Sequence, residues 1–184
     1  MDPSKASESL ALIREAGNAT RRAMARAGAG YQFVIWGLVW LFGYLGTQLL
    51  EGAASGYLWL ALDSFGVVAS AYAILRLSRR VRSPGAWKFG FFWLLLLAFG
   101  GLMMWVVWPL DQEEYVLFVT LLISMGYAVF GLWASTPLLI VGIAIAILAI
   151  LGWQLLPAYL GYWLAFTGGG GLIGAGLYIL RAWK

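Results

Sequence analysis

Asp63 is the residue whose type and position point most directly to chemistry. It lies inside the apolar run from Tyr57 to Leu77, in which Arg76 is the only other charged residue. Six helical residues at 1.5 Å each place Asp63 about 9 Å below the start of that run. An ionisable group at such a depth in a membrane costs on the order of a few kcal/mol and usually faces a bundle interior or a wet cavity. We therefore expect Asp63 to take part in ligand binding.

Other polar side chains are expected in the same half of the membrane as Asp63. They come from several apolar runs and are Tyr44, Thr47, Gln48, Thr120, Gln154, Tyr162 and Thr167. A carboxylate among aromatic rings suits a cationic or amine-bearing ligand, through charge pairing and cation–π contact. The sequence thus predicts a pocket in the outer half of the bundle, lined by aromatic residues and anchored by Asp63.

A structural role for Asp63 is the alternative. Its carboxyl group could be protonated, or could form a hydrogen bond to Thr47 or Gln48 across the first helical hairpin. Such a bond between membrane helices contributes about 0.6 to 2 kcal/mol. Both interpretations of Asp63 stay open at this point.

Several reaction chemistries lack the residues they need. The chain has no histidine and no cysteine, so it has no imidazole base, thiolate nucleophile or histidine haem ligand. It contains neither a GxSxG nucleophile elbow nor a GxxxxGK phosphate loop. We expect no enzymatic activity, no metal site and no cofactor.

Helices that cross a membrane must position these residues. Hydrophobic residues make up 62% of the 184-residue chain and charged residues 11%, against about 25% charged in a soluble domain. Each apolar run is close to the ~20 residues that span a ~30 Å hydrocarbon core as a helix. The predicted fold is all-α, a compact bundle of six transmembrane helices in one domain, residues 32–184. The expected spans are 32–50, 57–77, 87–108, 115–134, 137–156 and 158–180.

Basic residues predict the orientation. All 12 Lys and Arg residues lie in the N-terminal tail, in the turn after the second span, or at the C-terminus. The opposite side has only acids, namely Glu51, Asp111, Glu113 and Glu114. The positive-inside rule then places both termini in the cytoplasm of a multi-pass protein of the cell membrane, plasma or inner. Residues 1–31 are expected to form a cytoplasmic amphipathic helix.

The basic turn has two interpretations of its own. Its residues are Arg76, Arg79, Arg80, Arg82 and Lys88. Such a cluster sets topology, and it also attracts anionic lipid headgroups by about 1 kcal/mol per charge. Membrane lipids are the expected partners, and nucleic acid is not, because no motif that reads a groove is present.

Glycines mark the last span. Gly170 and Gly174 form a GxxxG pair, which lets two helices approach closely within the bundle or in a homodimer. The run of four glycines from Gly168 to Gly171 also allows an alternative, a locally unwound helix that binds substrate, as in transporters.

Two functions from different classes follow. The first is a membrane protein that binds or transports a small molecule or lipid through the pocket around Asp63. The second is a non-enzymatic regulator or assembly subunit of a membrane complex, which docks a cytoplasmic partner through its basic tail and its 76–88 turn.

Overall fold

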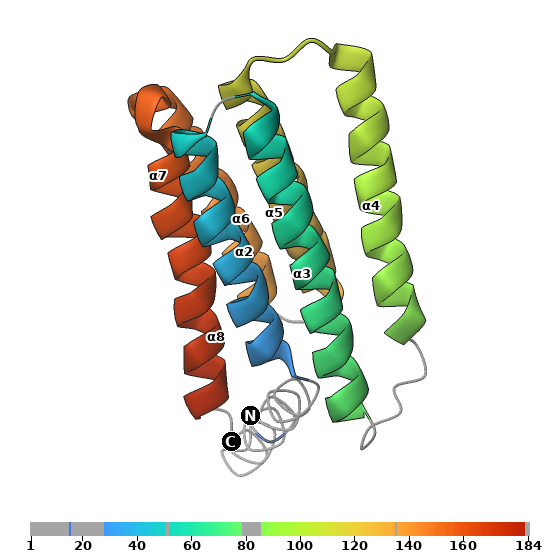
Figure 1. The fold of residues 1–184 in the computed structure, drawn as a ribbon. Coiled ribbons are helices and arrows are strands. Elements are labelled where there is room, and N and C mark those ends of the chain that lie inside the picture. Colours follow the sequence, from blue (N-terminus) through green and yellow to red (C-terminus); the bar gives the residue numbers. More distant parts are fainter. Residues whose placement is uncertain (1–14, 16–27, 51, 79–85, 135, 183–184) are drawn as a thin grey trace, which may run out of the picture.

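Helices account for nearly all of the chain that this computed structural model describes, namely residue 15 and residues 28–50, 52–78, 86–134 and 136–182 (Figure 1). The long helices are α2 (Ala29–Leu49), α3 (Ala53–Ser78), α4 (Ala86–Val107), α5 (Gln112–Ala134) and α6 (Thr136–Leu155). The last span is segmented into η1 (Pro157–Tyr159), α7 (Leu160–Leu164), η2 (Ala165–Gly170) and α8 (Gly171–Ala182). The all-helical class is confirmed for these residues. The amphipathic helix expected within residues 1–31 lies almost wholly outside them.

Within the described residues, six helices are long and apolar enough to cross a membrane, as predicted. Their bounds differ from the expected ones by at most four residues, the largest difference being at α3, which begins at Ala53 instead of Tyr57. Gly52 with φ 58 forms the tight turn between α2 and α3, a left-handed conformation that favours glycine. The helix can therefore start directly after this turn.

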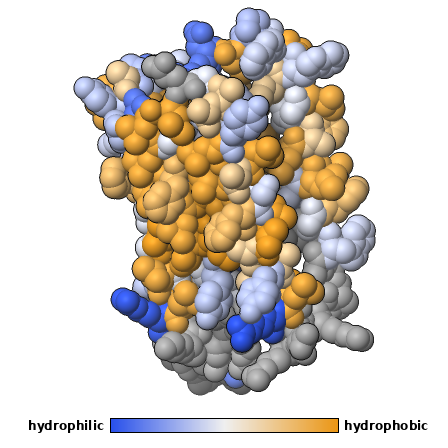
Figure 2. Space-filling model, in the orientation of Figure 1, coloured by the Kyte–Doolittle hydropathy of each residue, from blue (hydrophilic) through white to orange (hydrophobic). Residues whose placement is uncertain are grey.

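The ends of the bundle are polar and its sides are apolar. Figure 2 shows a broad hydrophobic band between hydrophilic ends. We call the end with Arg76, Lys88 and Arg181 the basic end, and the end with Asp111, Glu113 and Glu114 the acidic end. In each helical span the backbone N–H and C=O groups are hydrogen-bonded to one another, as a hydrocarbon environment requires.

The packing centre of the bundle is α2. It contacts α3, α7, η2 and α8, while α5 and α6 pack along each other (Figure 1). Its side chains Val39, Trp40 and Tyr44 are buried in the core together with Leu164 and Leu172 of the last span. By contrast, only 6% of the most apolar 18-residue stretch of α3 is buried, so most of the surface of α3 faces outward.

The last span changes its winding in its middle. Residues Ala165–Gly170 form a π-helix, in which hydrogen bonds run from residue i to i+5, between the α-helical segments α7 and α8. The glycine run allows this winding and also brings the backbone close to α2. The expectation of an unwound segment is therefore replaced by a wider helical turn that remains continuous with its neighbours.

Close packing in the last span uses a different glycine pair from the expected one. A methyl group added at Gly174 would meet nothing within 4 Å, and one at Gly170 would meet only Ala165 O at 4.0 Å. A methyl group at Gly169 would lie 2.6 Å from Leu41 N, and one at Gly176 would lie 2.7 Å from Gly30 O. Within this chain, Gly169 and Gly176 form the contact with α2, because the π-turn shifts which residues face it.

Candidate functional site

Asp63 lies in the middle of its span and on its outer surface. It is the tenth residue after Ala53, so it lies about 15 Å along α3, deeper than the 9 Å expected when the helix was counted from Tyr57. The residue is exposed at the surface of the chain. Among the residues that the structure describes, none forms a hydrogen bond or an ion pair with its carboxyl group. The predicted bond to Thr47 or Gln48 is thus not formed.

Tyr44 and Thr120, two of the predicted site residues, are brought together beside Asp63. The Tyr44 hydroxyl and Thr120 Oγ1 are 2.7 Å apart, and both side chains are buried. Thr120 also donates to Val116 O at 2.7 Å within α5. Asp63 is close enough to Tyr44 for an electrostatic interaction with its hydroxyl. This pair joins α2 to α5 inside the bundle.

Thr47 is bonded to Trp59, a residue that was not predicted to belong to the site. Trp59 of α3 donates its indole N–H to Thr47 Oγ1 at 2.8 Å, and the Trp59 ring meets the Tyr44 ring edge-on at 5.1 Å between centroids. Gln112 at the start of α5 donates to Thr47 O at 2.8 Å. Trp59 lies one helical turn from Asp63 on α3, so the i, i+4 spacing was a signal that could have identified it.

Gln48 and Gln154 lie apart from this cluster. Gln48 donates to Ala158 O at 2.9 Å and accepts from Gly161 N at 3.0 Å, so its amide fastens the start of the last span to α2. Gln154 is exposed near the end of α6, and it has no hydrogen-bond partner in the described part of the chain. Neither side chain shares a site with Asp63.

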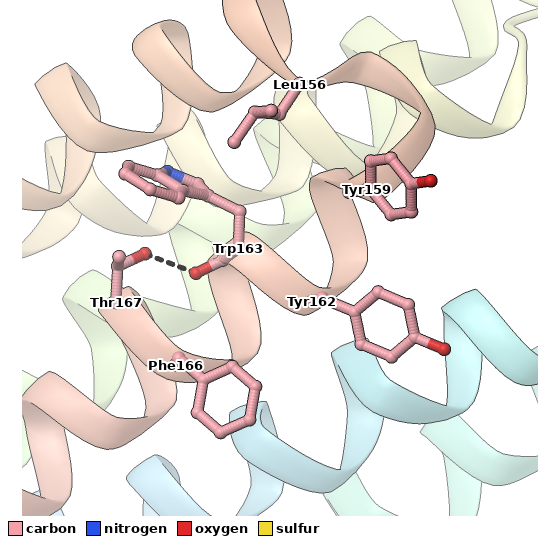
Figure 3. Close-up of a pocket in the computed structure, with 6 residues that line it drawn as sticks. All are labelled: Leu156, Tyr159, Tyr162, Trp163, Phe166 and Thr167. Atoms are coloured by element: carbon pink, nitrogen blue, oxygen red, sulfur yellow. Dashed lines mark hydrogen bonds between the residues drawn. The ribbon is translucent and has the colours of Figure 1, made fainter.

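Tyr162 and Thr167 line a separate groove of about 330 Å³ on the last span (Figure 3). The other lining residues are Leu156, Tyr159, Trp163 and Phe166. Thr167 donates to Trp163 O at 2.6 Å, and the Trp163 indole donates to Leu148 O at 2.8 Å. The groove therefore presents aromatic and aliphatic surface, with these two donors already satisfied. The single pocket expected from the sequence is divided into the Asp63 cluster, the Gln48 contact and this groove.

Ser70 is a further polar residue on the Asp63 side of α3. Its hydroxyl oxygen is buried and has no hydrogen-bond partner among the described residues. Gln32 of α2 donates to Ser70 O at 3.4 Å, so the two helices meet at this level. Seven residues separate Asp63 from Ser70, almost two full helical turns, which places both on one face.

A further hollow lies at the acidic end of the bundle. It has a volume of about 430 Å³ and is lined by Asp111, Gln112, Glu113, Glu114 and Trp153. No group of three or more metal-ligating side chains is found in the described part of the chain.

The basic turn is only partly described. Arg76 donates to the Tyr72 hydroxyl at 3.1 Å and lies over the Tyr72 ring at 5.8 Å. Arg79, Arg80 and Arg82 lie outside the described residues, and Lys88 is exposed on the first turn of α4.

No family model matches this chain, and neither a curated protein nor a solved structure matches it.

Proposed function

We propose that this chain is a small multi-pass membrane protein that binds a cationic, amine-bearing small molecule or lipid at Asp63. The observation that carries the proposal is a carboxyl group in the middle of an apolar span, exposed at the surface, with no ion-pair partner among the described residues. A carboxylate in hydrocarbon is stable only when it is paired or protonated. A cation that reaches it gains most of its binding energy from that pairing.

The cation must come from another molecule. All 12 Lys and Arg residues lie outside the middle of the spans, and Arg76 is the nearest along α3, 13 residues or about 20 Å from Asp63. A second copy of the chain would bring the same sequence and hence no mid-span cation. Trp59 lies one helical turn before Asp63 on α3 and is partly exposed, and an aromatic ring at that position favours a positively charged ligand over a neutral one.

The proposal includes an orientation in the membrane and a direction from which the ligand reaches Asp63. Both termini lie in the cytoplasm, and Asp63 is reached from the lipid-facing side of α3. Binding at this depth serves transport or sensing of a molecule already dissolved in the membrane. The regulator that docks through residues 1–31 and the 76–88 turn stays a prediction, because most of these residues lie outside the described ones.

Binding of the permanent cation tetraphenylphosphonium to the purified protein in lipid nanodiscs tests the proposal. We expect Asp63→Asn to weaken binding about 10- to 100-fold, because a charged interaction of roughly 1.5 to 3 kcal/mol is lost. Asp63→Glu keeps the charge and should bind within a few-fold of the wild type.

Glu113→Gln is the matched control, since it removes an acid at the acidic end and leaves the middle of the span unchanged. It should bind like the wild type. Equal binding by Asp63→Asn and the wild type, measured above the background of empty nanodiscs, would overturn the proposed function.

A further inference from the structure

We infer that the Asp63 site binds either a proton or the cation, never both, so that each monovalent cation that enters displaces one proton. This inference rests on the proposed function and adds a second ligand, the proton, to the same carboxyl group. It makes the chain an exchanger of cations for protons at mid-span.

Asp63 has no partner for its charge within the described part of the chain. Asp63 lies about 15 Å along α3 from its start, with no hydrogen-bond donor or cation in contact among the described residues. An unpaired carboxylate at that depth is costly, whereas the protonated acid is neutral. Without a bound cation the carboxyl group therefore holds a proton, and a cation can pair with it only after that proton has left.

Among the residues that the structure describes, no group near Asp63 supplies a positive charge. Tyr44 of α2, the helix packed against α3, is the ionisable side chain that interacts with it electrostatically. Tyr44 is neutral and already bonded to Thr120. The other ionisable side chains described on α2 to α5 are Tyr31, Tyr57, Tyr72, Arg76, Lys88, Glu113, Glu114, Tyr115 and Tyr127. The two cations in this set, Arg76 and Lys88, lie at the basic end of the bundle.

Ser70 provides the route for the proton. Its buried, unpartnered hydroxyl lies on the Asp63 face of α3, about 10 Å nearer the basic end. Buried hydroxyls without a protein partner are normally bonded to water, and Ser70 can both donate to and accept from one. Gln32 of α2 adds a polar side chain at the same level, where it donates to Ser70 O at 3.4 Å.

The exchange balances in charge and atoms. The O–H bond of the Asp63 carboxyl group breaks, the proton passes to water, and the electron pair stays on the carboxylate. The arriving cation pairs with that carboxylate. One positive charge leaves as another enters, so the middle of the span is neutral before and after.

Tetraphenylphosphonium binding at several pH values tests the exchange, since this probe does not itself titrate. In the wild type in nanodiscs we expect Kd to fall by about tenfold per pH unit for as long as the carboxyl group without the cation is protonated, and to level off once it is ionised. In weakly buffered solution with a pH indicator, about one proton should appear per cation bound at the lower pH.

Three outcomes separate this inference from the proposed function. A pH-independent Kd without proton release overturns the exchange and leaves the cation site standing. Binding by the wild type that Asp63→Asn does not weaken, or no binding at any pH, overturns both. Binding that follows pH and releases a proton in the wild type, and is weakened in Asp63→Asn, supports both.

The rate of proton release tests whether Ser70 lies on the proton route. Ser70→Ala should slow proton release after rapid mixing with tetraphenylphosphonium severalfold while leaving Kd within about twofold. Ser64→Ala, a change next to Asp63 on the exposed surface, is the matched control and should release protons at the wild-type rate. Equal rates in Ser70→Ala and the wild type would exclude Ser70 from the route.

Discussion

Glycines, which have no side chain, allow the last span to approach α2 closely. At Gly169 the nearest atoms to an added methyl group belong to the backbone of α2, Leu41 N at 2.6 Å and Gly37 O at 2.9 Å. Backbone atoms cannot move aside as the end of a flexible side chain can. Gly174, five residues later, faces open space. The two glycines therefore have opposite tolerance for a side chain.

Gly169→Ala should lower the free energy of unfolding by about 1 to 3 kcal/mol, because the added methyl group overpacks the contact with α2. Gly174→Ala should leave it unchanged or raise it by up to about 1 kcal/mol, since alanine favours the helix. Unfolding in mixed micelles with increasing dodecyl sulfate, followed by circular dichroism, measures both. Equal stabilities of the two variants would contradict the contact described for Gly169.

At the scale of elements, the π-helix Ala165–Gly170 sets the relative rotation of α7 and α8. Both flanking segments contact α2, and α8 does so through Gly176 against Gly30. A π-turn holds one residue more than the α-turn it replaces. The extra residue therefore keeps both segments in register with the same neighbour.

Deleting Gly170 should convert the i+5 pattern into a regular α-helix, keep the rotation of α8, and leave the stability close to that of the wild type. Deleting Gly174 should rotate the following residues by about 100° and move Gly176 and Ile179 away from α2, at a cost of roughly 2 kcal/mol or more. The same unfolding measurement, with size-exclusion profiles to confirm folded protein, compares the two deletions. Greater damage from deleting Gly170 would show that the π-turn does more than fix the register.

For the whole molecule, the arrangement of helices leaves the middle of α3 facing outward. The core forms around α2 and the last span. The most apolar stretches of α3 and α4 are only 6% and 11% buried. Asp63 therefore faces outward from the bundle and not into an enclosed cavity. Under the proposed function, a ligand dissolved in the membrane would reach it without any opening of the bundle.

The orientation predicted from the basic residues can be measured directly because the chain has no cysteine. In intact cells, Glu113→Cys at the acidic end should react with a membrane-impermeant maleimide from outside. Arg181→Cys at the basic end should react only after the membrane is permeabilised. The reverse pattern would place both termini outside and overturn the predicted topology.

The local features of the sequence determined the six helices, their approximate bounds and the identity of Asp63 as the exceptional residue. Run length, breaker residues and a charge within an apolar segment depend on neighbours along the chain, so they can be recognised without knowing the fold. The turn at Gly52 moved the start of α3 by four residues and so placed Asp63 deeper than expected.

Only the tertiary structure decided which polar groups meet. Tyr44 pairs with Thr120, Trp59 replaces Asp63 as the partner of Thr47, and Gln48 bonds the last span. These contacts depend on the rotation of each helix about its axis, which apolar residues on all sides do not specify. The same rotation selects Gly169 and Gly176 over Gly170 and Gly174, and it leaves Asp63 at the surface without a partner among the described residues.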